Sequence, residues 1–179
     1  MIHITNGGIA NMRAVTFIMT IIVMFTLAAC GGGGGSTGGS TSGSASSTGT
    51  LKLVCSGSLT KNLAGISITV PLPVGVTVAT DAAGKVLSTA IVPSGITANA
   101  ASIVPELTVY NAPSDSVAGS LAFVLVSSAN AGFGAGEFAS ITVTVAAGAS
   151  PPSGSIAAGS FKAVDISGAN VSGLTAVIQ

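Results

Sequence analysis

The chain from residue 51 to residue 179 is predicted to be all-β, a β-sandwich of about nine short strands. Apolar and polar residues alternate with period two in several segments, as they do in strands that are buried on one face. Turn-forming residues recur at close intervals between these segments. No segment has a convincing helical period, and the alanine-rich stretch 98–103 allows one short helical turn at most.

The clearest strands are predicted within residues 64–70 (AGISITV) and 140–145 (SITVTV). Each segment places branched apolar residues on one face and serine or threonine on the other, which is typical of a half-buried strand. The inward-facing residues of the two segments are Ile66, Ile68, Val70, Ile141, Val143 and Val145. Residues 121–126 (LAFVLV) form a continuous apolar run, which predicts a central strand covered on both faces or nearly so.

Proline, glycine, asparagine and aspartate mark the turns between these strands. The turn segments are 71–73 (PLP), 81–85 (DAAGK), 111–115 (NAPSD), 150–154 (SPPSG) and 167–170 (SGAN). Asp81 and Asp165 each place a single carboxylate beside a glycine turn. Because calcium sites gather several carboxylates, we expect hydrogen-bonded turns at both positions and no metal ion.

The composition excludes several classes of function. Charged residues make up 6% of the chain, against about 25% in an average soluble domain, and the formal net charge is zero. Nucleic-acid binding needs clustered lysine and arginine, so no nucleic-acid partner is expected. The single histidine, His3, precedes the domain, so Ser-His-Asp and Cys-His mechanisms lack a base and the common zinc ligand sets cannot form. We therefore expect a protein that is not an enzyme and that has no cofactor.

The N-terminal segment has the features of a secretory signal. Residues 14–29 (AVTFIMTIIVMFTLAA) carry no charge and follow Arg13. This run is shorter than the roughly 20 apolar residues of a membrane span, and it ends in small residues. Residues 1–29 are therefore predicted to be a signal peptide, with Met12 as an alternative start.

Residues 27–30 (LAAC) resemble the lipobox of bacterial lipoproteins. The resemblance implies that signal peptidase II cleaves between Ala29 and Cys30, and that a diacylglyceryl group, with further acylation, attaches Cys30 to the membrane. More than one acyl chain makes such attachment effectively permanent. Gly31 follows the cysteine, and the lack of an aspartate there favours the outer membrane of the cell envelope.

Residues 30–50 join this anchor to the domain. After Cys30 the segment consists of glycine, serine, threonine and one alanine, and it cannot bury enough apolar surface to become ordered. We expect a flexible linker whose ends lie about 25 Å apart on average. A phosphate-binding loop is disfavoured, because "GGGGG" follows no predicted strand and lacks the GK[ST] sequence.

The domain resembles cohesin-like domains in two places. Residues 132–173 (GFGAGEFASITVTVAAGASPPSGSIAAGSFKAVDISGANVSG) resemble the last third of such domains, with a glycine-rich bend, a "G-E-F-x-x-I-T" strand, a long loop and a strand ending near "D-x-x-G". Residues 64–78 (AGISITVPLPVGVTV) resemble their opening hairpin. The resemblance implies a nine-stranded jelly-roll sandwich, related to some carbohydrate-binding modules, that binds dockerin modules or builds surface assemblies. The low charge content departs from cellulosomal cohesins.

One thiol, two glutamates and a glycine-rich segment are further candidate sites. Cys55 alternates in register with Leu51 and Leu53, which predicts a buried thiol. Glu106 and Glu137 are candidates for a glycosidase pair, but we expect solvated surface charges. The segment 132–137 (GFGAGE) mimics a dinucleotide-binding loop loosely and is interpreted as a bend or bulge, because a strand follows it.

The aromatic residues bear on sugar binding, because sandwich-type sugar-binding modules expose a flat platform of rings. Phenylalanines on strands are expected in the core, whereas Tyr110 and Phe133 are assigned to loops and are the candidates for sugar contacts. The favoured hypothesis is a lipid-anchored envelope protein that displays a cohesin-like sandwich to an envelope or extracellular protein. The alternative is a carbohydrate-binding module that recognises polysaccharide from the same anchor, and an envelope hydrolase is the least favoured function.

Overall fold

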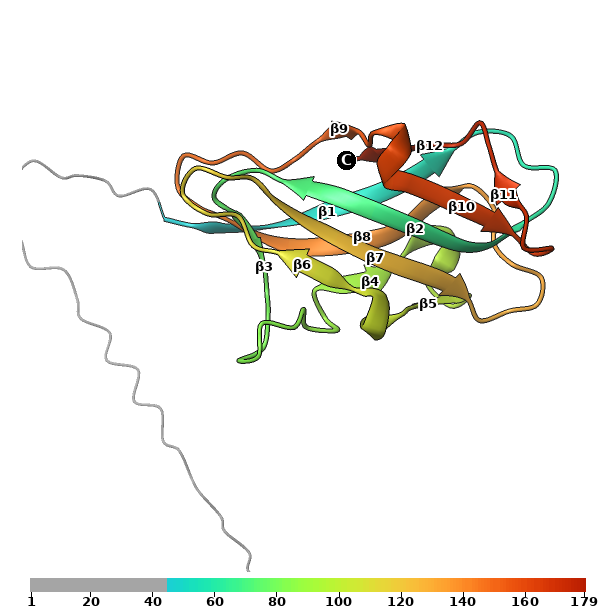
Figure 1. Ribbon diagram of the computed structural model, residues 1–179, viewed down its shortest axis with the longest axis horizontal. Helices are drawn as coiled ribbons and strands as arrows, with labels where there is room; N and C mark the ends of the chain where they lie inside the picture. Colours follow the sequence, from blue (N-terminus) through green and yellow to red (C-terminus); the bar gives the residue numbers. More distant parts are fainter. Residues whose placement is uncertain (1–44) are drawn as a thin grey trace, which may run out of the picture. The chain divides into compact units, whose positions relative to one another are not determined.

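The structure is a computed structural model that describes residues 45–179, and these residues form two antiparallel sheets packed face to face (Figure 1). Sheet A contains, in order, β3 (Val76–Val78), β8 (Gly136–Val145), β1 (Ser47–Ser56), β12 (Thr175–Ile178) and β9 (Gly154–Ser155), and β4 (Ile91–Pro93) also pairs with β8. Sheet B contains, in order, β11 (Asn170–Val171), β10 (Phe161–Asp165), β2 (Leu63–Leu72), β7 (Gly119–Ser127) and β5 (Ala101–Ile103), and β6 (Val109–Asn111) also pairs with β7. The predicted all-β sandwich is confirmed.

Short segments connect and close the sandwich. Residues 45–179 include three 3₁₀ turns: η1 (Gly95–Thr97), η2 (Pro105–Leu107) and η3 (Ala158–Ser160). The helical turn expected within residues 98–103 lies just before them, at η1, whereas Ala101–Ile103 is a strand. The described residues contain twelve strands in place of about nine, because short strands such as β9 and β11 pair along the sheet edges.

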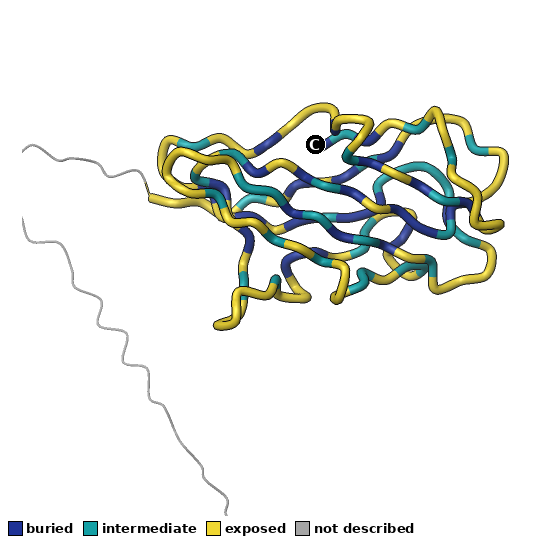
Figure 2. The backbone as a smooth tube through the Cα atoms, in the orientation of Figure 1, coloured by how far each residue is buried: buried dark blue, intermediate teal, exposed yellow. Residues whose placement is uncertain are grey.

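The core lies between the two sheets, as the alternation of buried and exposed residues along the tube in Figure 2 shows. All six inward-facing residues predicted from the alternation of 64–70 and 140–145 are buried. Phe138 of β8 and Phe161 of β10 meet across the sheets with ring centroids 6.3 Å apart. The core residues and all strand pairs belong to residues 47–178, so this part of the chain folds as a unit of its own.

The boundary between linker and domain differs from the sequence prediction. β1 begins at Ser47, and its residues Ser47–Thr50 pair with Thr142–Val145 of β8. Composition assigned these residues to the flexible linker because they carry no large apolar side chain. Their backbone hydrogen bonds to β8 extend the strand without such side chains. Residues 45–179 contain no helix long and apolar enough to cross a membrane.

The strand predicted at 121–126 is also partly different. β7 is an interior strand of sheet B, as expected, and its residues Leu121, Phe123 and Leu125 are buried. Its other face is not covered, because Ala122 and Val124 are only half-buried and Val126 is 36% exposed. A continuous apolar run thus supplies both the core and an apolar outer surface.

Candidate functional site

The outer surface of sheet B carries an apolar patch, which we call the valine face. It consists of Val109, Ala122, Val124, Val126 and Val164. Strand register brings these residues together, because residues opposite each other on paired strands point to the same side. Val109 lies opposite Ala122, Val124 opposite Ser67, and Val126 opposite Gly65, which in turn lies opposite Val164.

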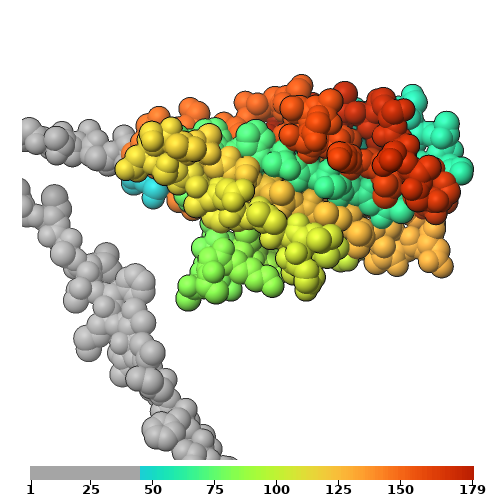
Figure 3. All heavy atoms as spheres, in the orientation of Figure 1, coloured from blue at the N-terminus to red at the C-terminus, as the bar shows by residue number. Residues whose placement is uncertain are grey.

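A shallow groove runs over the valine face along β2. Its volume is about 430 Å³, and it is lined chiefly by Ala64, Ser67, Val124, Val126, Lys162 and Val164. Figure 3 shows this surface, with the atoms of β2 exposed between those of β10 and β7. The groove follows β2 because Gly65 and Ser67 are small, while the β-branched side chains of β7 stand beside them as a ridge. Among the described residues that line the groove, Lys162 is the only charged one.

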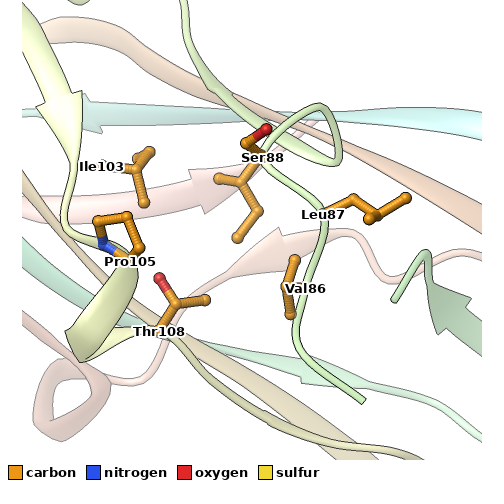
Figure 4. A pocket seen from close by; sticks show the side chains of 7 residues that line it. Val86, Leu87, Ser88, Ile103, Pro105 and Thr108 are labelled. Carbon is orange, nitrogen blue, oxygen red and sulfur yellow. The ribbon is translucent and has the colours of Figure 1, made fainter. Parts of the chain in front are cut away.

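A second, smaller pocket lies where the edges of the two sheets approach each other (Figure 4). Its volume is about 90 Å³, and Val86, Ile91, Ile103, Pro105 and Thr108 line it. The Thr108 hydroxyl donates a hydrogen bond to the Val104 carbonyl at 3.1 Å and is therefore already used within the fold. The pocket is far smaller than a typical ligand site, and Ser88 is the other hydroxyl-bearing residue in its lining.

The outer surface of sheet A is chemically different. Five exposed threonines form what we call the threonine face: Thr48, Thr50, Thr77, Thr142 and Thr144. Thr144 lies between Thr48 and Thr77 in register, and Thr142 lies opposite Thr50. This face offers its hydroxyl groups to water.

An ion pair borders the threonine face. Lys52 Nζ lies 3.1 Å from Glu137 Oε2, and the lysine side chain is 56% exposed. The Ser94 hydroxyl and then the Lys52 ammonium lower the pKa of Glu137. Ser94 Oγ is buried and has no partner in good hydrogen-bond geometry, whereas Lys52 Nζ donates a hydrogen bond to Glu137. An exposed pair of this kind adds little stability.

Both aspartate turns predicted from the sequence are confirmed. Asp81 Oδ1 accepts hydrogen bonds from the backbone N–H groups of Ala83 and Lys85, each at 2.9 Å. Asp165 Oδ1 accepts from the backbone N–H groups of Ser167 and Ala169 and from the Ser167 hydroxyl. The Ser167 hydroxyl is the largest cause of the lowered pKa of Asp165. These carboxylates therefore serve the turns, and residues 45–179 hold no cluster of three potential metal ligands.

The thiol and the glycine-rich segment also lie as predicted. Cys55 is 1% exposed, and burial raises the pKa of its thiol, so it is an unreactive core residue. The segment 132–137 bends before β8 begins at Gly136, and within it Phe133 and Leu63 exchange two backbone hydrogen bonds. A bulge follows, because Leu53 pairs with Ala139 while Val54 pairs with Glu137, leaving Phe138 without a partner in the ladder.

The assignment of Phe133 to an exposed loop is wrong, since its side chain is 3% exposed and packs in the core. A backbone bridge to Leu63 of β2 holds this loop against the core. The glycines around Phe133 had indicated an exposed loop. Tyr110 was also assigned to a loop but lies on strand β6. It is half-buried, and its hydroxyl accepts a hydrogen bond from the Val78 N–H of the opposite sheet at 3.3 Å. Phe123, Phe138 and Phe161 are core residues as predicted. Residues 45–179 thus present no platform of aromatic rings.

The two glutamates lie on different elements of the sandwich. Glu106 is exposed on η2, at the edge of sheet B, and Glu137 lies on β8 of sheet A beside Lys52. No hydrogen bond joins them within the described part of the chain. The predicted cleavage and lipid-attachment residues, Ala29 and Cys30, lie outside the described residues.

Comparisons with protein-family models, with curated proteins and with solved structures find no match to this chain.

Proposed function

We propose that this protein is a lipid-anchored protein of the bacterial cell envelope, and that its jelly-roll, cohesin-like sandwich binds a protein through the valine face. The valine face carries the proposal. It places half-exposed valines in the interior of a sheet, around a groove of about 430 Å³, in a chain whose other sheet presents threonine at the equivalent positions. Apolar surface of this kind marks contact sites in proteins.

The jelly-roll part of the proposal is supported by the order in which the chain visits the two sheets. β1 belongs to sheet A and β2 to sheet B, β3 and β4 return to sheet A, and β5 to β7 lie in sheet B. The chain then crosses three more times, so that β12 closes sheet A beside β1. The alternative, a carbohydrate-binding module, loses its support because four phenylalanines are buried and the Tyr110 hydroxyl is hydrogen-bonded.

The anchor is tested by metabolic labelling with palmitate in a bacterial host. The wild-type protein is expected to incorporate the label and to fractionate with membranes, because two or more acyl chains hold a protein permanently. Cys30→Ser is expected to lose the label. Cys55→Ser is the matched control and should retain it, because Cys55 is buried in the sandwich. Equal labelling of the wild type and Cys30→Ser contradicts the anchor.

The docking surface is tested by site-specific photo-cross-linking in intact cells. A photo-reactive side chain in place of Val124 samples the valine face, and the same side chain in place of Thr142 samples the threonine face. Val124 is expected to give discrete protein adducts, while Thr142 gives none or a diffuse background. Adducts of equal yield from both positions would show that the valine face has no special role.

A further inference from the structure

We propose that the valine face binds a second copy of this chain, forming a two-fold symmetric dimer in which sheet B of one copy packs on sheet B of the other. This inference rests on the proposed function, because it names the protein that occupies the same surface. Three features support a second copy: the shape of the face, the positions of two charges, and the direction of β1.

The face combines a ridge with a hollow of matching length. Val124 and Val126 of β7 form the ridge, and they lie opposite Ser67 and Gly65 of β2, which form the hollow. A two-fold axis parallel to the strands and midway between β2 and β7 exchanges these two strands between copies. The ridge of each copy then lies over the hollow of its partner, and aligned sheets commonly interdigitate in this way.

Two charges flank the same row of the sheet on opposite sides. Lys162 lies opposite Ser67, which lies opposite Val124. The Val124 carbonyl accepts a hydrogen bond from the Val104 N–H, and Glu106 follows two residues later on η2. From strand spacing, Lys162 and Val104, the residue before η2, are about 14 Å apart, with the proposed axis midway between them. The axis therefore brings Lys162 of each copy over the start of η2 of the other, the turn that carries Glu106.

The same axis preserves strand direction. β1 of both copies begins at the same end of the dimer, so both chains reach the sandwich from the same side (Figure 1). Two copies anchored in one membrane can pair in this arrangement, whereas an axis perpendicular to the strands would turn one copy away. The domain also carries little charge to oppose pairing, since four lysines face five carboxylates after Cys30.

The contact is small, so the dimer is expected to be weak in solution. Four strands of about four outward rows span roughly 400 Å² on each copy, about half of a standard interface. On a membrane, tethering raises the effective concentration toward the millimolar range, which favours pairing without further contacts.

The test is sedimentation equilibrium of residues 31–179, which contain the whole sandwich, at concentrations up to about 1 mM. A monomer–dimer equilibrium is expected. Val124→Lys and Val126→Lys are expected to abolish it, and Thr142→Lys is the matched control on the threonine face. A protein that stays monomeric throughout this range, or a dimer that survives both valine substitutions, overturns the inference.

Charge reversal tests the symmetry. Lys162→Glu places two like-charged pairs across the axis, as does Glu106→Lys, so each variant alone is expected to dimerise about tenfold more weakly. Mixing the two variants restores both opposite-charge pairs, so a heterodimer of wild-type affinity is expected. Lys85→Glu is the control, because Lys85 lies in the Asp81 turn away from the face. Failure of the mixture to recover affinity rejects the proposed axis.

The cross-linking experiment separates this inference from the function on which it rests. Adducts between Val124 positions of two copies support the dimer. Adducts from Val124 to a different protein, with a monomer in solution, retain the proposed docking function and reject the second copy. The absence of any protein adduct from Val124 rejects both.

Discussion

The outer faces of the two sheets are built on the same alternation but differ in chemistry. In sheet A, threonine occupies outward positions of β1, β3 and β8, and Lys52, Ser140 and Glu137 lie on the same face. In sheet B, valine and alanine occupy outward positions of β6, β7 and β10, while β2 between β7 and β10 contributes Ser67 and Thr69. The inward positions of both sheets are uniformly apolar. Folding requires only the inward pattern, so the outward pattern reveals what each face meets: water at sheet A and, as we propose, protein at sheet B.

The largest effect is expected from removing the core that both faces share. Phe138 is fully buried and meets Phe161 across the sandwich. Phe138→Ala is expected to lower the free energy of unfolding by about 3–5 kcal/mol, through lost burial and the cavity that remains. Urea denaturation of residues 31–179 measures this change. Thr142→Ala, on the outer side of the same strand, should change the free energy of unfolding by no more than about 0.5 kcal/mol. A similar loss of stability in both variants would contradict the assignment of Phe138 to the inner face and Thr142 to the outer face.

One carboxylate in each sheet accepts hydrogen bonds or forms an ion pair, and replacing it is expected to have an intermediate effect on stability. Asp165 of sheet B accepts three hydrogen bonds that hold the turn after β10, whereas Glu137 of sheet A pairs with an exposed lysine. Asp165→Asn is therefore expected to lower the urea midpoint more than Glu137→Gln. Equal effects would show that the turn does not depend on the charged carboxylate.

The contribution of Asp165 to stability is expected to decrease at low pH. Hydrogen bonds from Ser167 and Ala169 lower the pKa of Asp165 in the folded protein. The charged form therefore stabilises the fold above the pKa of the unfolded chain, near 3.9, and the contribution is lost as the pH falls through the lower folded value. Between pH 7 and pH 2 the wild-type urea midpoint should fall more steeply than that of Asp165→Asn. Parallel curves would contradict this role.

The smallest effect is expected from exchanging the two outer surfaces. Val124→Thr and Thr142→Val each replace an outward side chain by one of similar shape. Both should change the free energy of unfolding by less than about 1 kcal/mol, because surface positions tolerate such substitutions. Retention on a hydrophobic column should fall for Val124→Thr and rise for Thr142→Val. If retention changes for Thr142→Val but not for Val124→Thr, the valine face does not contact the column and is covered by other protein surface.

The strands that alternate strictly could be predicted from the sequence. Ile66 to Val70 and Ile141 to Val145 are half-buried strands because period two specifies both the backbone and the buried side. The exposure of the outer face of β7 could not be predicted from its apolar run, because the sequence of such a strand is the same whether its second face is covered or open. The start of β1 was missed because backbone pairing with β8, and not side-chain burial, orders Ser47 to Thr50.

Some candidate residues could likewise be predicted from local sequence, and others could not. The aspartate turns and the buried Cys55 followed from local sequence, since each depends on neighbours only a few residues away or on simple alternation. Phe133 did not, because its burial depends on a bridge to Leu63 about 70 residues earlier. The valine face was also missed, because strand order alone brings β6, β7 and β10 together.

The position of β1 has a mechanical consequence. The chain enters the sandwich at Ser47 along the axis of β1, which is paired with β8 on one side and with β12 on the other. A pull on the N-terminus therefore acts parallel to the strand and at right angles to its hydrogen bonds. Such a load shears all the bonds of β1 together instead of peeling them one by one, so the sandwich is expected to resist force applied through its leading strand.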